Sequence, residues 1–364
     1  QLPASNLVFL VDVSGSMQSP DKLELLKSAL RLLVRELKAE DRVSLVVYAG
    51  ASGVVLEPTA GDQAATITAA LNALTAGGST NGAAGIKMAY SLAQQAFIKD
   101  GINRVILATD GDFNVGTVDF EMLKQLVEER REQGIGLTTL GFGSGNYNDH
   151  LMEQLADAGN GNYAYIDTLS EARKALVDEM SSTLMTIARD VKIQVEFNPA
   201  TVAEYRLIGY ENRALAREDF SNDKVDAGEI GAGHSVTAIY EIALTGSAGQ
   251  RLDGGRYQQT RAAEANTGEL AMVKLRYKQP GADRSTLTEQ VVRKADILQA
   301  LDDTSEAYRF AAAVAGLGQV LRGGKYTGDF AYTEVLALAR GARGDDPFGY
   351  RGEFLQLTNL ASSL

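Results

Sequence analysis

Three oxygen-bearing side chains follow one apolar segment near the start of the chain, at every second position. Asp12, Ser14 and Ser16 come directly after residues 7–11, and Gly15 lies between the two serines. Carboxylate and hydroxyl oxygens are ligands of hard divalent cations, Mg²⁺ first and Mn²⁺ or Ca²⁺ next. The pattern therefore predicts a metal site. The alternative is an ordinary turn between a strand and a helix, in which the serines only cap the helix.

A buried strand would place these side chains at the edge of a sheet. Residues 7–11, LVFLV, form the short apolar run that is typical of a parallel strand covered on both faces. Ligands of open α/β sheets bind just beyond the carboxyl ends of such strands. Thr80 lies in a glycine-rich loop at residues 77–82, and Asp110 follows a second apolar run at residues 104–108. We therefore expect one edge of the sheet to carry all the metal ligands, which are Asp12, Ser14, Ser16, Thr80 and Asp110.

Strands and helices alternate from residue 7 to about residue 188. The strands that we expect there are residues 7–11, 42–48, 54–56, 104–108, 135–140 and 163–166. The helices that we expect are residues 20–37, 64–74, 83–97, 120–133, 149–158 and 169–186. This order predicts a doubly wound, Rossmann-like α/β domain with a mainly parallel sheet, in which residues 54–56 form an antiparallel edge strand.

The pattern changes after residue 189. Alternating polar and apolar residues predict half-buried antiparallel strands at residues 191–197, 202–208, 236–244 and 270–277. We interpret residues 278–289 as a polar link, and the helices that we expect after it are residues 291–301, 305–322, 332–340 and 350–360. The predicted organisation is an α/β domain at residues 1–188, a small antiparallel β-domain at residues 189–283, and a C-terminal helical region at residues 284–364 that packs on the preceding domains.

The composition of the 364-residue chain excludes several classes of function. Its formal charge of −12 argues against nucleic acid as a partner, because an acidic surface repels phosphates. The absence of cysteine excludes disulfides and thiolate metal sites. No apolar run reaches the roughly 18 residues of a transmembrane helix, so we expect no transmembrane segment in this chain.

Residues 5–188 resemble the von Willebrand factor type A domain. The D-x-S-x-S pattern at residues 12–16, the loop residue Thr80 and the T-D-G sequence at residues 109–111 match its metal-ion-dependent adhesion site. Several further stretches are similar to a bacterial subfamily, the YfbK-like proteins, and they are residues 103–116, 140–149, 159–168, 192–200, 205–213 and 309–324. The resemblance covers essentially the whole chain.

This resemblance implies a binding protein rather than an enzyme. In such a site Ser14, Ser16 and Thr80 would coordinate the metal directly, whereas Asp12 and Asp110 would act mostly through bound water. An ion held mainly by neutral oxygens keeps residual positive charge, and its open position would take an Asp or Glu side chain of a protein partner. We therefore expect metal-dependent protein recognition or cell adhesion, and we leave the oligomeric state open.

The same resemblance implies an extracytoplasmic location, in the periplasm or at the cell surface, because proteins of this subfamily are typically secreted or lipid-anchored. Gln1 lies only a few residues before the first strand, and we expect a leader, an anchor or a further domain to precede it. A cytoplasmic location is the alternative.

Two other functions compete with metal-dependent binding. A scaffold or assembly protein would keep the type A fold without using the metal. A Mg²⁺-dependent hydrolase would need a nucleophile or base and a phosphate clamp, and Ser14 stands where a second carboxylate would follow Asp12. We therefore favour the binding protein.

Two other features of the sequence are weaker evidence of function. The sequence G-F-G-S-G at residues 141–145 follows a predicted strand, but Asn146 stands where a dinucleotide-binding fingerprint requires glycine. His150 and His234 are isolated, and we expect structural roles for both.

Overall fold

The chain forms two compact units. The computed structural model describes residues 3–79, 82–111, 120–143, 149–179, 185–209, 214–225, 227–252 and 268–364. Unit 1 consists of Gln1–Val191, Asp226–His234 and Tyr277–Arg284, and unit 2 consists of Lys192–Val225, Ser235–Arg276 and Ser285–Leu364. The predicted division into three domains stays a prediction.

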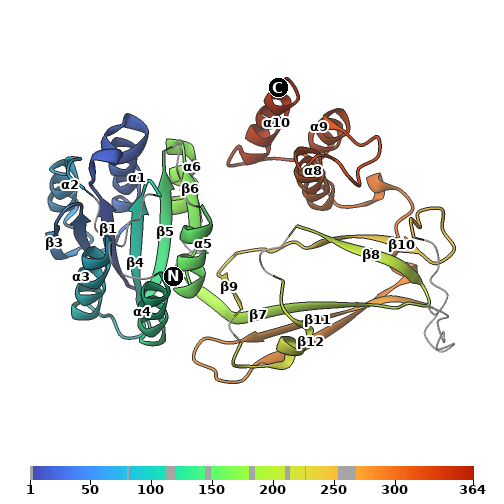
Figure 1. Ribbon diagram of the computed structural model, residues 1–364, viewed down its shortest axis with the longest axis horizontal. Coiled ribbons are helices and arrows are strands. Elements are labelled where there is room, and N and C mark those ends of the chain that lie inside the picture. Colours follow the sequence, from blue (N-terminus) through green and yellow to red (C-terminus); the bar gives the residue numbers. More distant parts are fainter. Residues whose placement is uncertain are drawn as a thin grey trace. The chain divides into compact units, whose positions relative to one another are not determined.

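Unit 1 is built on a six-stranded sheet with the order β3-β2-β1-β4-β5-β6 (Figure 1). The strands are β1 (Ser5–Asp12), β2 (Arg42–Tyr48), β3 (Ser52–Ala60), β4 (Ile102–Thr109), β5 (Gly136–Phe142) and β6 (Tyr163–Ile166). All neighbours pair in parallel except β2 and β3, which are antiparallel and leave β3 at the edge. The predicted doubly wound, mainly parallel sheet with one antiparallel edge strand is therefore confirmed.

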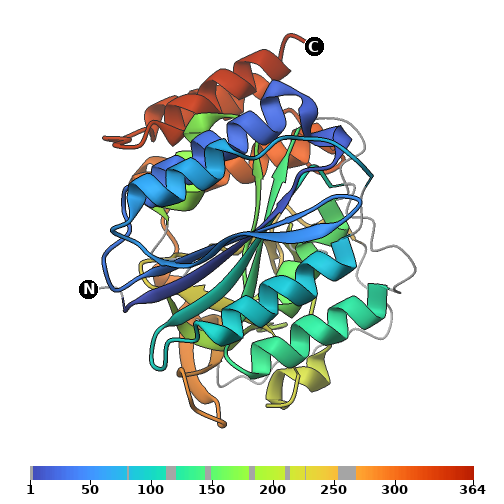
Figure 2. The ribbon, with the colours of Figure 1, turned by 90° about the vertical axis from the view of Figure 1, so that its left-hand side faces the viewer.

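Helices cover both faces of this sheet, as the turned view shows (Figure 2). One face carries α1 (Leu25–Val34), α2 (Ala64–Asn72) and α6 (Leu169–Arg173), and the other carries α3 (Gly82–Gln95), α4 (Phe120–Glu132) and α5 (Asp149–Ala158). Successive side chains of a strand point to opposite faces, so helices on both faces of the sheet cover every side chain of β1. This explains why every residue of β1 is buried.

The helix predicted at residues 169–186 is wrong at its end. In the structure α6 continues into a π-helical turn, η3 (Lys174–Asp178), whereas Thr186 is already the first residue of β7 (Thr186–Phe197). Residues 180–184 lie outside the described residues. The β-branched side chains of Thr186 and Ile187 favour a strand, and Thr186 pairs with Gly231 of β9 (Gly228–Gly231), which the sequence pattern had not revealed.

Unit 2 begins within β7 and is mostly antiparallel. Its sheets contain β7, β8 (Val202–Ile208), β10 (Ile239–Leu244), β11 (Glu269–Lys278) and β12 (Thr286–Arg293), with the neighbours β12-β11-β7 in one sheet and β10-β8 in the other. A short 3₁₀ turn, η5 (Arg217–Ser221), lies between β8 and β9 in the chain. The four predicted antiparallel strands are confirmed, with altered ends.

The helix predicted at residues 291–301 is wrong. The preceding segment is not a polar link, because β12 extends to Arg293 and only short 3₁₀ turns follow, at Lys294–Asp296 and Leu301–Asp303. The threonines and valines of β12 favour a strand, and its polar residues suit its exposed surface. The predicted boundary at residues 283 and 284 thus falls between two paired strands.

The last three helices agree with the prediction. They are α8 (Glu306–Leu321), α9 (Tyr332–Gly341) and α10 (Tyr350–Ala361). Ser305 caps α8, since its hydroxyl accepts a hydrogen bond from the backbone N–H of Tyr308 at 3.1 Å. Ala313, Val335 and Ala339 form their small buried core. In the part of the chain that the structure describes, no helix combines the length and apolarity needed to cross a membrane.

Candidate metal centre

The turn after β1 is fixed from two sides by backbone hydrogen bonds. The N–H of Val13 donates to the carbonyl of Tyr48 at the end of β2, at 3.0 Å. The N–H of Gly15 donates to the carbonyl of Gly78 at 3.0 Å, and the N–H of Gly77 donates to the carbonyl of Val13 at 2.8 Å. The glycine-rich loop therefore lies against this turn, as the sequence predicted for the loop that contains Thr80.

Asp12 is fully buried at the carboxyl end of β1, and neutral donors hold both of its oxygens. Its Oδ1 accepts a hydrogen bond from the N–H of Ser14 at 2.8 Å, and its Oδ2 accepts one from the Thr109 hydroxyl at 3.1 Å. A carboxylate held in this way is oriented by its neighbours and is not neutralised by them. It suits the predicted role of a ligand that acts through water or orients the hydroxyls beside it.

Burial raises the pKa of Asp12 above its usual value. The hydrogen bond from Ser14 opposes this rise, and the negative charge of the nearby Asp110 adds to it. The ionised form of Asp12 therefore costs free energy in this setting. A divalent cation placed beside the two carboxylates would offset that cost.

The serine hydroxyls face each other at the mouth of the site. Ser14 Oγ and Ser16 Oγ are 2.9 Å apart, so one small cation could contact both. Ser14 is 1% exposed, whereas Ser16 is exposed to solvent. If the hydroxyls coordinated an ion, the exposed side of Ser16 would leave room for a further ligand from outside.

Asp110 completes the described part of the site from the end of β4. Its side chain is 3% exposed, and its Oδ2 accepts a hydrogen bond from the ammonium of Lys22 at 2.9 Å. The same ammonium donates to the backbone carbonyl of Ser16 at 3.0 Å. One nitrogen atom thus connects the β4 end of the site with the β1 turn.

The structure brings together Asp12, Ser14, Ser16 and Asp110, and Thr80 lies outside the described residues. No group of three or more His, Cys, Asp or Glu side chains arranged to hold a metal occurs among the described residues. The fit to a divalent ion therefore depends on the paired hydroxyls and on the two buried carboxylates. That donor set suits Mg²⁺, which accepts neutral oxygens and retains water. The ligand assignments stay predictions.

Sequence reasoning missed Lys22. It lies in a short helical turn, η2 (Pro20–Glu24), immediately before α1. A basic side chain in the first turn of a helix is unfavourable with respect to the helix dipole, so its position was a signal that it pairs with an acid elsewhere. Which acid it pairs with could not be read from the sequence, because Asp110 lies 88 residues further on.

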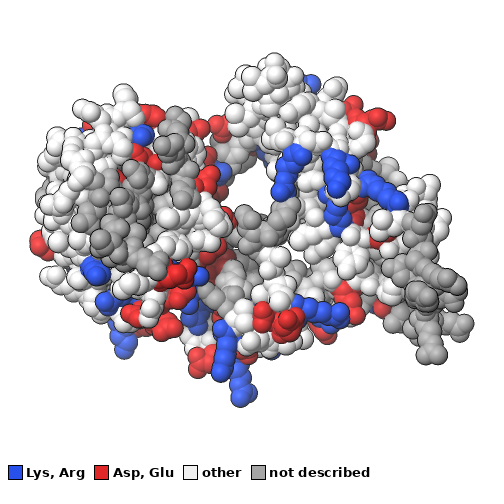
Figure 3. Space-filling view, viewed as in Figure 1, with Lys and Arg blue, Asp and Glu red and all other residues white. Residues whose placement is uncertain are grey.

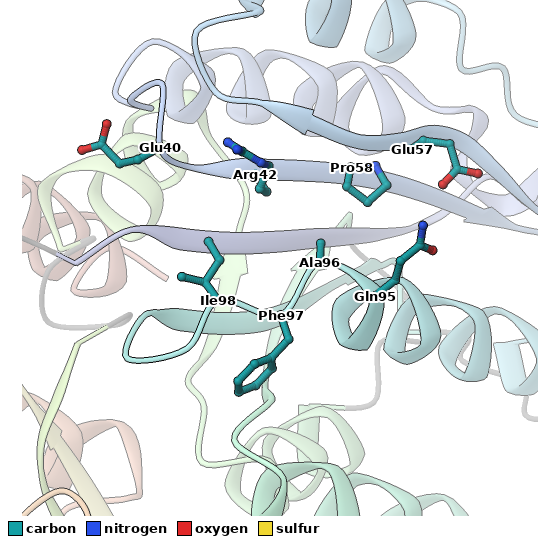
Figure 4. Close-up of a pocket in the computed structure, with 8 residues that line it drawn as sticks. All are labelled: Glu40, Arg42, Glu57, Pro58, Gln95, Ala96, Phe97 and Ile98. Carbon is teal, nitrogen blue, oxygen red and sulfur yellow. The ribbon is translucent and has the colours of Figure 1, made fainter.

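An open groove of about 850 Å³ lies at the opposite end of the sheet of unit 1 (Figure 4). Arg42, which lines it, pairs with Asn6 at the start of β1, whereas Asp12 at the end of β1 pairs with Tyr48. The Arg42 guanidinium donates to the carbonyls of Ala39 and Asp41 and so serves the local backbone. The remaining lining residues are Glu40, Glu57, Pro58, Gln95, Ala96, Phe97 and Ile98. We assign no function to this groove.

The two histidines, and the described part of the glycine-rich stretch at residues 141–145, gain no catalytic or dinucleotide-binding role from the structure. His150 lies 3.1 Å from Gln154 on the same helix, through side-chain nitrogens at the surface of α5. The N–H of His234 donates to the carbonyl of Gly231 in a turn. Residues 144–148 of the glycine-rich stretch lie outside the described residues. The structural roles of both histidines stay predictions.

Comparison with known proteins identifies two families in the chain. Residues 7–112 match the von Willebrand factor type A domain, and residues 182–364 match a family described as the C-terminal part of the uncharacterized protein YfbK. The chain is 48% identical to YfbK of Escherichia coli K12 over 366 residues, which cover 100% of this chain and 63% of that protein. It is 30% identical to the uncharacterized protein sll0103 of Synechocystis over 50% of this chain and 43% of that protein.

The chain therefore spans about two fifths to three fifths of the length of these relatives. Among solved structures, a von Willebrand factor type A protein from Catenulispora acidiphila is 18% identical to the chain. That match has a TM-score of 0.48 and covers 96% of this chain and 82% of the other.

Proposed function

This chain belongs to the YfbK family of proteins with a von Willebrand factor type A domain, and we propose that it is a metal-dependent protein-binding module. Type A domains generally mediate protein binding. The proposed metal is Mg²⁺, with Mn²⁺ or Ca²⁺ as alternatives, and the proposed ligand is an Asp or Glu side chain of a partner protein. The setting that we propose is extracytoplasmic.

The observation that carries this proposal is the pair of facing hydroxyls on Ser14 and Ser16, in front of two buried carboxylates. Hydroxyls contribute no negative charge, so an ion that they hold keeps much of its own positive charge. The carboxylates of Asp12 and Asp110 lie behind the hydroxyls, where they would hold water or orient the ligands. The bound ion would then supply an electrophilic position that a carboxylate from outside could occupy.

The residues of this chain set the geometry of such binding. Asp12 holds the turn through the N–H of Ser14, and the hydrogen bonds between this turn and Gly77 and Gly78 keep the glycine-rich loop in place. A preformed turn needs little ordering when a partner binds. The partner's specificity would come from the protein surface around the ion, since a single carboxylate contact is common to many acidic partners.

The test begins with Mg²⁺ and Mn²⁺ titrated into the protein by isothermal calorimetry. The wild type is compared with Asp12→Ala and with Asp12→Asn, which has nearly the same shape. A partner is then captured from extracytoplasmic extract of the source bacterium, with and without EDTA. The proposal requires binding that EDTA abolishes, that Mg²⁺ restores and that both Asp12 variants lose. Equal Mg²⁺ binding by wild type and variants would refute it.

The same experiments distinguish the two alternatives. A scaffold in which the type A domain is structural would capture the same partners with and without EDTA. A hydrolase would release product from a panel of phosphoesters in a Mg²⁺-dependent manner, and Asp12→Asn would abolish that release.

A further inference from the structure

The ammonium of Lys22 contacts two parts of the candidate metal centre. It lies 2.9 Å from Oδ2 of Asp110 and 3.0 Å from the carbonyl oxygen of Ser16. The side chain of Lys22 is 17% exposed and that of Asp110 is 3% exposed, so the pair is shielded from bulk water. The Coulombic attraction between charges in such a setting is larger than at the surface, and salt screens it less.

Gly143, directly after β5, leaves the space that the Lys22 side chain occupies. A side-chain carbon on Gly143 would lie 2.3 Å from Cε and 2.8 Å from Cγ of Lys22, so any larger residue would displace this arm. The backbone at Gly143 has a φ of +80°, which also favours glycine. The hydroxyl of Tyr165 donates to the carbonyl of Gly143 at 2.6 Å and fixes this position.

We propose that Lys22 is an internal competitor of the metal. By pairing with Asp110, its ammonium sets the concentration of divalent cation at which the site becomes occupied. The inference rests on the proposed metal-binding function and adds a regulation of the same site. Asp110 is one of the two carboxylates that would attract the ion, and the ammonium already neutralises it. A divalent cation must displace the ammonium or bind beside it, and either route lowers the affinity.

Electrostatics gives this inference a definite sign. Removing the positive charge makes the site more negative, so divalent affinity should rise. If Lys22 instead positioned Asp110 for the metal, its removal would lower the affinity. The two roles therefore predict opposite changes in a single binding constant.

The test is calorimetric titration of Mg²⁺ into the wild type and Lys22→Met, which keeps most of the stem and removes the charge. We expect Lys22→Met to bind Mg²⁺ about tenfold more tightly. Thermal unfolding gives a second readout. In EDTA the melting temperature of Lys22→Met should be below that of the wild type, and Mg²⁺ should raise it by more than it raises the melting temperature of the wild type. Lys22→Arg keeps the charge and should stay within about twofold of the wild type.

Two further variants make the test specific. Lys27→Met removes a buried lysine that lies further along the same helical segment and pairs with Glu24 at 2.7 Å, and it should leave the Mg²⁺ affinity unchanged. Gly143→Ala should displace the Lys22 arm without altering any charge and should raise the Mg²⁺ affinity in the same direction as Lys22→Met.

The outcomes separate the inference from the proposed function. If the wild type binds Mg²⁺ and Lys22→Met binds it equally or more weakly, the competitor role is wrong and the metal site stands. If neither the wild type nor Lys22→Met binds Mg²⁺, the proposed function fails and the inference fails with it. Should Lys22→Met be unfolded in EDTA, the result with Gly143→Ala decides.

Discussion

Asp110 in unit 1 and Glu241 in unit 2 both bind basic side chains, but the surroundings of the two carboxylates differ. In unit 1 the buried Asp110 binds the ammonium of Lys22. In unit 2 the carboxylate of Glu241, whose side chain is 39% exposed, binds the guanidiniums of Arg206 and Arg251. One acid is enclosed next to polar groups that suit a metal, and the other lies near the surface between two cations.

Arg206 and Arg251 make further contacts within unit 2. The Arg206 guanidinium lies 4.4 Å from the centre of the Tyr326 ring and also donates to the side chain of Gln319 at 2.8 Å. Arg251 donates to the backbone carbonyl of Tyr326 at 3.1 Å. Figure 3 shows Lys and Arg side chains gathering on this face of unit 2, around α8 and the strands beside it. These contacts connect β8, α8 and the turn after α8.

The surroundings of a carboxylate decide how a cation bound to it should be interpreted. In unit 2 the two guanidiniums contact both the carboxylate and the aromatic ring, so a purely structural role accounts for the cluster. In unit 1 the pair stands beside two facing hydroxyls and a second buried carboxylate, and packing alone does not require that combination. We therefore expect substitutions at the Asp110 site of unit 1 to change metal binding, and substitutions in the Glu241 cluster of unit 2 to change stability.

The largest effect expected is that of Asp12→Asn on metal binding. Loss of the charge, with little change of shape, should weaken Mg²⁺ binding by about 100-fold, because the carboxylate that orients the Ser14 turn and attracts the ion is gone. Calorimetry measures the affinity, and circular dichroism verifies the fold. A change of less than about twofold would refute the proposed metal site.

A smaller effect is expected for Arg206→Met in unit 2. The substitution removes the ion pair with Glu241, the contact with the Tyr326 ring and the hydrogen bond to Gln319. The free energy of unfolding should fall by about 1–2 kcal/mol, measured by urea denaturation. The Mg²⁺ affinity should not change. A loss of Mg²⁺ binding in this variant would contradict the separation of roles between the units.

The smallest effect concerns Asp346 at the start of α10. Its carboxylate accepts hydrogen bonds from the backbone N–H groups of Arg351 at 3.0 Å and Gly352 at 2.8 Å. Burial alone would raise the pKa of Asp346, but these hydrogen bonds and the nearby Arg343 lower it overall. The stability that Asp346 contributes is therefore present above its unfolded pKa of about 3.9 and is lost as the pH falls through the lower, folded pKa.

Asp346→Asn should thus lower the free energy of unfolding by about 1 kcal/mol at pH 7, as the loss of a helix cap does. The difference from the wild type should shrink as the pH falls below the unfolded pKa of about 3.9 and should vanish below the folded pKa, because the protonated acid resembles the amide. Denaturation at a series of pH values measures this. A difference that is the same at pH 3 and pH 7 would show that the charge of Asp346 is irrelevant.

The sequence predicted unit 1 better than the rest of the chain, for physical reasons. Strands such as β1 are buried on both faces and are read as continuous apolar runs, and the helices between them are periodic. The end of the helix at residues 169–186 and the helix at residues 291–301 were wrong, because strand pairing decided the structure there. The short β9 contains two glycines and carries little signal of its own.

The candidate site shows the same limit. Asp12, Ser14, Ser16 and Asp110 could be predicted, since the carboxyl ends of neighbouring parallel strands must meet. Lys22 could not be assigned to the site, because a long side chain reaches it from the following helix across Gly143. Such a contact depends on tertiary packing, which no local pattern encodes.

The most direct test of the central claim is the relaxation rate of water protons in the presence of Mn²⁺ bound to the protein. A bound ion with an open position exchanges water rapidly, and a carboxylate that takes this position displaces that water. We predict that the wild type enhances relaxation, that a glutamate-containing peptide lowers the enhancement, and that Asp12→Asn shows none. Relaxation equal to that of free Mn²⁺, or an enhancement that the peptide leaves unchanged, would contradict the account.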